Sequence, residues 1–233
     1  MAAEPAGLGR DPALSALDAL LKSPPAVRAD RVEAYLVRRS GGYARCARSR
    51  IHQSAEESSL SVSLRAAVGG GVGTASTGRL APDALRDALE SALRAARAVS
   101  EVSETSGGER LGPLAEPGAG SGDAPDGRLD EETARFGAPS RAEALFRAFR
   151  VAAGSGQTVA GVFATWLEER AAANTAGLRA YAARTVAETH LIVEGERDGN
   201  YTPSGYAHGV CGRAADLDVD ALTRKAVEKC ARS

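Results

Sequence analysis

A stretch of alternating side chains that ends in three consecutive glycines places the strongest limit on the fold. From Leu60 to Ala66, apolar residues alternate with polar ones, which is the two-residue period of a strand with one buried face. Gly69–Gly71 follow and form the strongest turn signal in the chain. We therefore expect residues 71–77 to return as a second strand. Residues 49–54 are expected to form the preceding strand, with 56–58 as a polar connection.

The residues on either side predict an antiparallel sheet covered by helices. Residues 32–37 alternate like a strand, and Gly41–Gly42 is a hairpin-type break from which residues 43–48 would return. The sheet would have about four or five strands. The clearest helix spans residues 82–99, where alanine and leucine form one continuous apolar stripe. Aromatic residues make up only 4% of the chain, so alanine and leucine must fill the core.

The composition divides the chain into four parts. Residues 1–29 would hold a tail and a short helix, and residues 30–99 a first α/β domain. Residues 100–127, rich in serine, glycine, glutamate and proline, are expected to form a flexible linker or loop. In residues 128–233, two long extended runs would meet at the turn Asn174–Gly177 as a β-ribbon. The expected fold class is α+β: a mostly antiparallel sheet with covering helices, followed by a second α/β unit with a long ribbon.

Charge, cysteines and hydropathy exclude several classes of protein. The formal charge is −1, so the whole chain has no basic field for nucleic acid. Three cysteines lie far apart without a C-x-x-C motif, which argues against a disulfide framework and favours a reducing cytoplasm. No apolar run approaches the ~20 residues of a membrane helix, and the N-terminus is a poor signal peptide. We expect a soluble cytoplasmic protein without a membrane partner.

The reactive side chains do not form a recognisable catalytic or metal-binding pattern. His52, His190 and His208 are all the histidines, and none of them has a partner at the spacing of a zinc motif. His208 and Cys211 are three residues apart, which could be half of a metal site or a nucleophile with its base, but no second ligand pair accompanies them. Cys46 is interpreted as a small strand residue and Cys230 as a helix residue. We therefore expect no catalytic, cofactor-binding or metal-binding residue in this chain.

Two further motifs have simpler interpretations than their functional ones. The run Gly69–Gly73 invites comparison with a phosphate-binding loop, but no Lys-Ser/Thr follows and the next helix starts some ten residues later. The arginines at positions 38, 39, 45, 48 and 50 could touch nucleic acid. Acidic neighbours dilute this cluster, and stacking aromatics are scarce. A hairpin turn and a solvated strand surface are the expected outcomes, and nucleic acid is not an expected partner.

Taken together, several of these motifs resemble one known family. They are the run Arg48–Ile51, Glu56-Glu57, Ser63–Arg65 and Gly71–Ser76, followed by the helix that ends at Ala98. In this order they resemble the N-terminal domain of the TldD/PmbA family, which was named for modulation of DNA gyrase and includes zinc metallopeptidases and their partner subunits. The later run Ala172–Gly177, then Arg184-Thr185 and Gly205–Ala207, is similar to the family's middle region. The resemblance covers about residues 31–231.

The resemblance implies a part in proteolysis without catalysis by this chain. Active members carry a His-Glu-x-x-x-His zinc motif in a C-terminal domain, and no such motif occurs here. Zinc would therefore belong to an absent C-terminal domain or to a partner subunit. The implied function is that of a non-catalytic region of a TldD/PmbA-type peptidase that contributes to homo- or heterodimer assembly and to binding of unfolded peptide. The alternative is a stand-alone interaction or scaffold domain without a proteolytic role.

Overall fold

The protein is built around one six-stranded sheet in which every neighbouring pair of strands is antiparallel. The computed structural model describes residues 7–106, 114–116, 129–196 and 202–233. The strand order is β3-β2-β1-β4-β5-β6. The strands are β1 (Arg31–Ala47), β2 (Arg50–Val68), β3 (Gly71–Thr77), β4 (Thr158–Asn174), β5 (Arg179–Glu194) and β6 (Ser204–Cys211). The α+β fold class with a mostly antiparallel sheet is confirmed.

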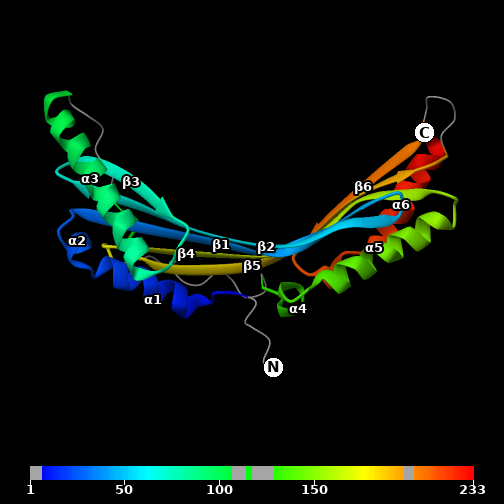
Figure 1. Cartoon of the computed structure of the whole chain (residues 1–233), viewed down its shortest axis with the longest axis horizontal. Coiled ribbons are helices and arrows are strands. Elements are labelled where there is room, and N and C mark those ends of the chain that lie inside the picture. The colour runs from blue at the N-terminus through cyan, green and yellow to red at the C-terminus, as the bar shows by residue number, and fades with distance from the viewer. Residues whose placement is uncertain (1–6, 107–113, 117–128, 197–201) are drawn as a thin grey trace.

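The described helices pack on the same face of this sheet. They are α1 (Arg10–Leu21), α2 (Pro24–Val27), α3 (Pro82–Ser106), α4 (Glu131–Ala134), α5 (Ala138–Ala153) and α6 (Val219–Arg232), with a short 3-10 turn at Ala214–Asp216. Along β1 the even-numbered residues point towards the helices and, apart from Arg38 and Ser40, are buried there, whereas the odd-numbered residues point to the other face. Figure 1 shows the long strands running across the molecule and rising at both ends, with α1, α4 and α5 along the lower, convex side. The other face, which we call the open face, has no described helix on it.

The fold consists of two similar halves that we did not predict. The first half runs helix α1, strands β1 to β3, helix α3, and the second runs helix α5, strands β4 to β6, helix α6. β1 and β4 pair antiparallel along almost their whole length, from Glu33 with Asn174 to Cys46 with Gly161. The halves are therefore related by an approximate two-fold axis near the middle of this pairing, and Figure 1 shows the same succession at both ends.

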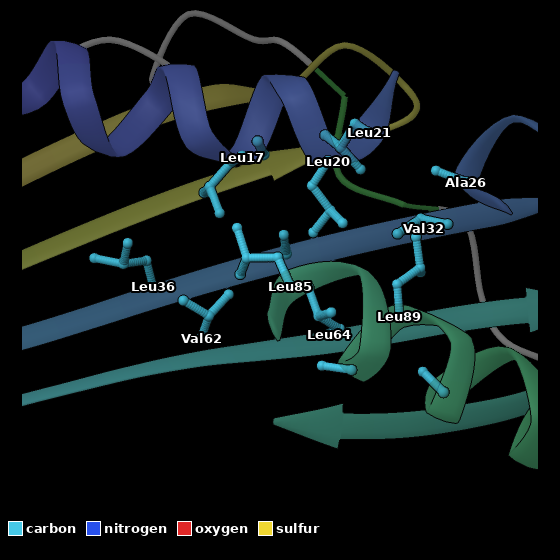
Figure 2. Close-up of a cluster of buried hydrophobic side chains, with 14 of the residues drawn as sticks. Leu17, Leu20, Leu21, Ala26, Val32, Leu36, Val62, Leu64, Leu85 and Leu89 are labelled. Carbon is cyan, nitrogen blue, oxygen red and sulfur yellow. The ribbon is translucent and has the colours of Figure 1, made fainter. Parts of the chain in front are cut away.

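Each half has its own hydrophobic core between helices and sheet. Figure 2 shows the first: leucines of α1 and α3 meet the even-numbered apolar residues of β1 and β2. Leu17, Leu36, Leu64 and Leu89 are almost completely buried there. A fully buried leucine contributes about 1.5–3 kcal/mol relative to an exposed one. The second core joins α5 and α6 to β4, β5 and β6.

Glycines in the edge strands let the helices approach closely. A Cβ atom on Gly73 would run into the backbone of α3 at Ala92, and one on Gly205 would run into the backbone of α6 at Ala226. Glycine is needed at these sites because the helix backbone occupies the space of a side chain. This close contact explains why a core so poor in aromatic residues can still be tightly packed.

The predicted turn at Gly41–Gly42 is wrong, because β1 continues through both residues. The reason is close packing on the two faces of the strand. A Cβ on Gly41 would meet the backbone of Trp166 on the neighbouring strand, and a Cβ on Gly42 would meet the guanidinium of Arg141 from α5. The reversal comes later, at Arg48–Ser49, both of which have positive φ angles (50° and 52°).

The polar connection predicted at residues 56–58 is also wrong. β2 is one strand from Arg50 to Val68, and its residues 53–67 pair continuously with β1. Its side chains at 56–59 are exposed, so the alternation that reveals a half-buried strand is missing there. The Gly69–Gly71 turn is confirmed: Gly69 and Gly70 have φ angles of 57° and 88°, and β3 follows at once.

The second part of the chain confirms the long ribbon and adds a strand. β4 and β5 pair from Thr158 to Ala173 around the predicted turn. β6 was missed because its residues lie in a glycine-rich stretch. The predicted linker begins as helix, since α3 extends to Ser106, and most of residues 107–128 lie outside the described part. The division into domains stays a prediction, although strands from both proposed units form one sheet.

Candidate binding face of the sheet

The antiparallel register brings distant residues into rows across the open face. Arg39 in β1 pairs with Glu168 in β4, and Glu168 pairs with Arg184 in β5. In the next row, Gly41 lies beside Trp166, which lies beside Val186. Directly paired residues point to the same face. A charged and aromatic cluster therefore forms near the centre of the sheet.

Trp166, the only tryptophan in the chain, is the largest side chain of this cluster. Its partner on β1 is Gly41, where a side chain would run into the backbone of Trp166. The guanidinium carbon of Arg39 lies 3.8 Å from the ring centroid, a cation–π contact. The indole Nε1–H donates a hydrogen bond of 3.0 Å to Glu188. These contacts leave only 7% of Trp166 exposed although no helix covers it, so the guanidinium forms the outer surface of the cluster.

Carboxylates hold the two guanidinium groups of the cluster. Glu168 lies 3.6 Å from Arg39 and 2.6 Å from Arg184. Two arginines and two glutamates balance in formal charge. The cluster can therefore interact with ligand side chains of either charge. A carbonyl or amide group of a ligand can also replace one of these surface contacts.

Two further groups of rings extend the open face towards the β6 end. Arg45 lies over the ring of Tyr43 at 4.8 Å, and the Tyr43 hydroxyl accepts a 2.9 Å hydrogen bond from Gln53. His190 and His208 are directly paired across β5 and β6, with ring centroids 5.8 Å apart and only 13° between the ring planes. Tyr206 stacks on His208 at 5.6 Å and is 44% exposed. The arrangement offers stacking surfaces but no nucleophile activated by a base.

The opposite face of the same strands has a structural role. Glu169 is 1% exposed and accepts hydrogen bonds from the backbone N–H groups of Leu8 (2.9 Å) and Gly9 (2.7 Å), from Arg38 (2.7 Å) and from the Tyr181 hydroxyl (2.8 Å). Burial alone would raise the pKa of Glu169, but these donors together hold that pKa below its usual value. The carboxylate thus fastens the start of α1 to β4. Glu168 and Glu169 are adjacent in sequence, yet one is on the open face and the other is in the interior.

Arg141 is a second buried structural charge, located under the centre of the sheet. It is 1% exposed and donates to the Phe136 carbonyl and, at 2.8 Å, to the Thr165 hydroxyl. It also forms an ion pair with Glu56 at the edge of β2. Burial lowers the pKa of Arg141 from its usual value. The residue joins α5 to three parts of the chain and is not available to a ligand.

The histidines and cysteines considered in the sequence do not converge. His208 and Cys211 lie on the same strand, but three positions apart, so they point to opposite faces. Cys46 is buried, and burial raises the pKa of its thiol to about 11, which makes it unreactive. His52 is exposed on β2, far in sequence from the other two histidines. In the part of the chain that the structure describes, no three side chains of His, Cys, Asp or Glu gather as metal ligands would.

The arginines at positions 38 to 50 are dispersed by the fold. Arg38 points into the interior towards Glu169, whereas Arg39 and Arg45 lie on the open face. Arg48 is in the turn between β1 and β2. They therefore do not form one continuous basic surface. The sequence did not predict the cluster at Trp166, because its partners are brought together only by the pairing of β1 with β4. The one signal in the sequence that could have indicated it is a tryptophan within an alternating run.

Comparison with known proteins gives one family match and several similar structures. Residues 32–96 match the family described as PmbA/TldA metallopeptidase domain 1. Comparison with curated proteins gives no match. Among solved structures, TldE from Thermococcus kodakarensis is 20% identical with a TM-score of 0.80, covering 93% of this chain and 47% of that one.

Two bacterial structures described as modulators of DNA gyrase are also similar. The protein from Thermotoga maritima is 15% identical with a TM-score of 0.74, covering 93% of this chain and 47% of that one. The protein from Bacteroides thetaiotaomicron is 18% identical with a TM-score of 0.72, covering 97% and 51%. The chain thus spans about half the length of these proteins and shares their fold over that half. Among the described helices, none is long and apolar enough to cross a membrane.

Proposed function

We propose that this chain is a non-catalytic part of a cytoplasmic TldD/PmbA-type peptidase and binds unfolded peptide substrate on the open face, and the match of residues 32–96 to the first domain of that family supports this proposal. The observation that carries the proposal is the position of every described helix on one face of a long sheet. The other face is left to side chains that suit a peptide. In the same assembly the chain would pair with a second subunit of its own or a related kind.

The chemistry of the open face fits an unfolded polypeptide of varied sequence. Rings such as Tyr43 and Tyr206 stack with aromatic and apolar side chains, and the carboxylates and guanidinium groups around Trp166 meet charged ones. An extended chain exposes its backbone amides along its whole length, whereas a folded protein has already paired most of them. The proposed surface therefore favours unfolded over folded polypeptides.

Cleavage would be performed elsewhere in the assembly. The described residues do not fit a zinc site, because no three metal-ligand side chains lie together. A family zinc motif in further sequence or in a partner subunit would supply the hydrolytic centre. The part of this chain is to hold the substrate in an extended form.

Tryptophan fluorescence tests the proposal directly. With an unfolded polypeptide that lacks tryptophan, all emission comes from Trp166, at the centre of the open face. We expect saturable binding that shifts this emission, and no binding of the same polypeptide when folded. Tyr43→Ser should weaken binding about tenfold, a typical loss for a central aromatic contact. Phe146→Ser on α5, which removes an exposed ring from the helix side, should leave binding unchanged.

The alternative, a scaffold domain without a role in proteolysis, gives a different result. Such a domain would bind a folded partner and would not distinguish unfolded from folded polypeptide. Equal binding of the two forms, or equal effects of the Tyr43 and Phe146 substitutions, would contradict the proposed function.

A further inference from the structure

One long edge of the sheet lies open in the middle of the molecule. β3 pairs only with residues 62–68 of β2. Residues 50–61 of β2 pair with β1 on one side, and none of the described strands pairs with them on the other. Most of their side chains are exposed, on both faces of the sheet. Alternate backbone N–H and C=O groups along this edge therefore point outwards, as on any edge strand.

The equivalent edge in the second half of the fold is contacted at two points by other parts of the chain. There, β6 pairs with residues 187–194 of β5, which leaves residues 179–186 without a neighbouring strand. Arg179 forms an ion pair with Asp18 of α1, and the Thr185 hydroxyl accepts a hydrogen bond from the backbone of Asp130. Thr185 also donates to the carbonyl of Gly212. The side chains of residues 179–186 are mostly half-buried, whereas most of those of residues 50–61 are exposed, so the edge of β2 is the more exposed of the two equivalent edges.

The regular part of the open edge has the length of a short peptide. The register with β1 shifts at Arg45 and Cys46, and His52 is the extra residue on β2, a β-bulge. The regular edge is therefore Gln53–Ser61. At about 3.3 Å per residue it extends over roughly 30 Å, in line with β3.

Apart from Gln53 and Leu60, the side chains of this edge are small, hydroxylated or acidic. Serine occupies positions 54, 58, 59 and 61. At the centre, Glu56 points to the helix side and is held by Arg141. Glu57 points to the open face beside Gly41, is exposed, and no ion pair involves it among the described residues. The edge therefore tolerates many neighbouring side chains but carries one available negative charge.

We infer that an extended segment of unfolded polypeptide adds to β2 along Gln53–Ser61, in line with β3, and places a basic side chain beside Glu57. This inference rests on the proposed function, since it gives the unfolded substrate a place and a charge preference. Strand addition supplies affinity through backbone hydrogen bonds, which do not depend on sequence. The carboxylate adds a preference for lysine or arginine at the central position.

Charge argues against a second copy of this chain as the occupant. Two copies that pair antiparallel with their helices on the same side are related by a two-fold axis through the edge. If the whole regular edge is used, the axis passes through Glu57 and sets this carboxylate directly opposite its own copy. Like charges directly opposite each other destabilise a strand pair, whereas a foreign strand can place a cation there.

A charge-reversal experiment tests the inference. Fluorescent nine-residue peptides, identical except for a central lysine or glutamate, would be titrated into the wild-type chain and the Glu57→Lys variant. We expect the wild type to prefer the lysine peptide about three- to fivefold, the range of an exposed charge pair. Glu57→Lys should reverse the preference and Glu57→Gln should abolish it. Glu90→Lys, on the exposed side of α3, should leave it unchanged.

Backbone methylation separates strand addition from simple charge attraction. Two isomeric lysine peptides would carry N-methyl groups on alternate residues, on opposite edges of the extended peptide. Strand addition predicts that one isomer loses at least tenfold in affinity and the other binds like the parent peptide. Equal binding by both isomers, an unchanged preference in Glu57→Lys, or a concentration-dependent dimer that Glu57→Lys disrupts would each overturn the inference. The proposed function would survive these results if unfolded polypeptide still binds, and would fail if it does not.

Discussion

Replacing Glu169 by glutamine tests whether the two faces of the sheet have the roles assigned to them. Glu169 is 1% exposed and accepts four hydrogen bonds. One of them comes from Arg38, whose side chain is 22% exposed. The amide keeps one acceptor oxygen but turns an NH₂ group towards donors that then have no partner. A buried donor left without a partner costs about 1–3 kcal/mol. Arg38 can reach water, which limits its share, so we expect a loss of roughly 3 kcal/mol.

Glu168→Gln is the matched control, because it makes the same chemical change one residue away on the open face. Glu168 interacts with Arg39 and Arg184, whose side chains are 44% and 50% exposed. Ion pairs of this kind contribute about 0–1 kcal/mol. Urea unfolding followed by circular dichroism would measure the free energy of unfolding of both variants. A loss below 0.5 kcal/mol for Glu169→Gln (about the usual surface effect), or equal losses in the two variants, would refute the reasoning.

The pH dependence of Glu169→Gln has a defined sign. Because the pKa of Glu169 is lowered in the folded protein, its ionised form stabilises the fold at every pH above the unfolded pKa of about 4.3. That contribution is lost as the pH falls through the folded pKa. The difference in unfolding free energy between wild type and Glu169→Gln should therefore be complete at pH 7 and should shrink below about pH 4. A difference that stays constant to pH 2 would contradict the role of the charge.

Three further predictions concern packing and reactivity. Gly73→Ala should lower the free energy of unfolding by at least about 1–3 kcal/mol, the usual cost of overpacking, because the new methyl group meets the backbone of α3. Gly78→Ala is the control and should change thermal unfolding little, because the atom nearest to its new methyl group is 3.5 Å away. At pH 8, Cys211 should react with iodoacetamide in the folded protein and Cys46 only after unfolding, since the pKa of the Cys46 thiol is about 11; mass spectrometry of the digested chain checks this. Arg141→Ala should destabilise by roughly 2–4 kcal/mol in urea, with Arg141→Lys only partly restoring stability, because the planar guanidinium serves several acceptors.

Local patterns in the sequence predicted those elements whose signals are also local. The stripe of α3 and the turn at Gly69–Gly70 depend on neighbours within a few residues, and both are confirmed. Gly41–Gly42 was wrongly predicted as a turn, because a glycine pair also occurs where other groups approach a strand closely. Residues 56–58 were wrongly predicted as a connection, because an edge strand that is exposed on both faces shows no alternation of apolar and polar residues. β6 was hidden by the glycines that bring it against α6.

The candidate site was less predictable than the fold, because it depends on strand register. Arg39 and Trp166 are far apart in sequence and meet only through the pairing of β1 with β4. A shift of that register by one residue would move Trp166 into the interior and Glu169 to the open face. The family resemblance noted in the sequence rested mainly on the β2–β3 region, and the family match to residues 32–96 includes that region.

Site-specific photo-crosslinking tests most directly whether the open face holds unfolded polypeptide. A benzophenone amino acid would replace Tyr43 on the open face or Phe146 on the helix side, both in the otherwise unchanged chain. Illumination with an unfolded polypeptide should give a covalent adduct from position 43 and little from position 146, and excess unlabelled polypeptide should compete. Adducts of equal yield from the two positions, or an adduct from position 146 alone, would contradict the account.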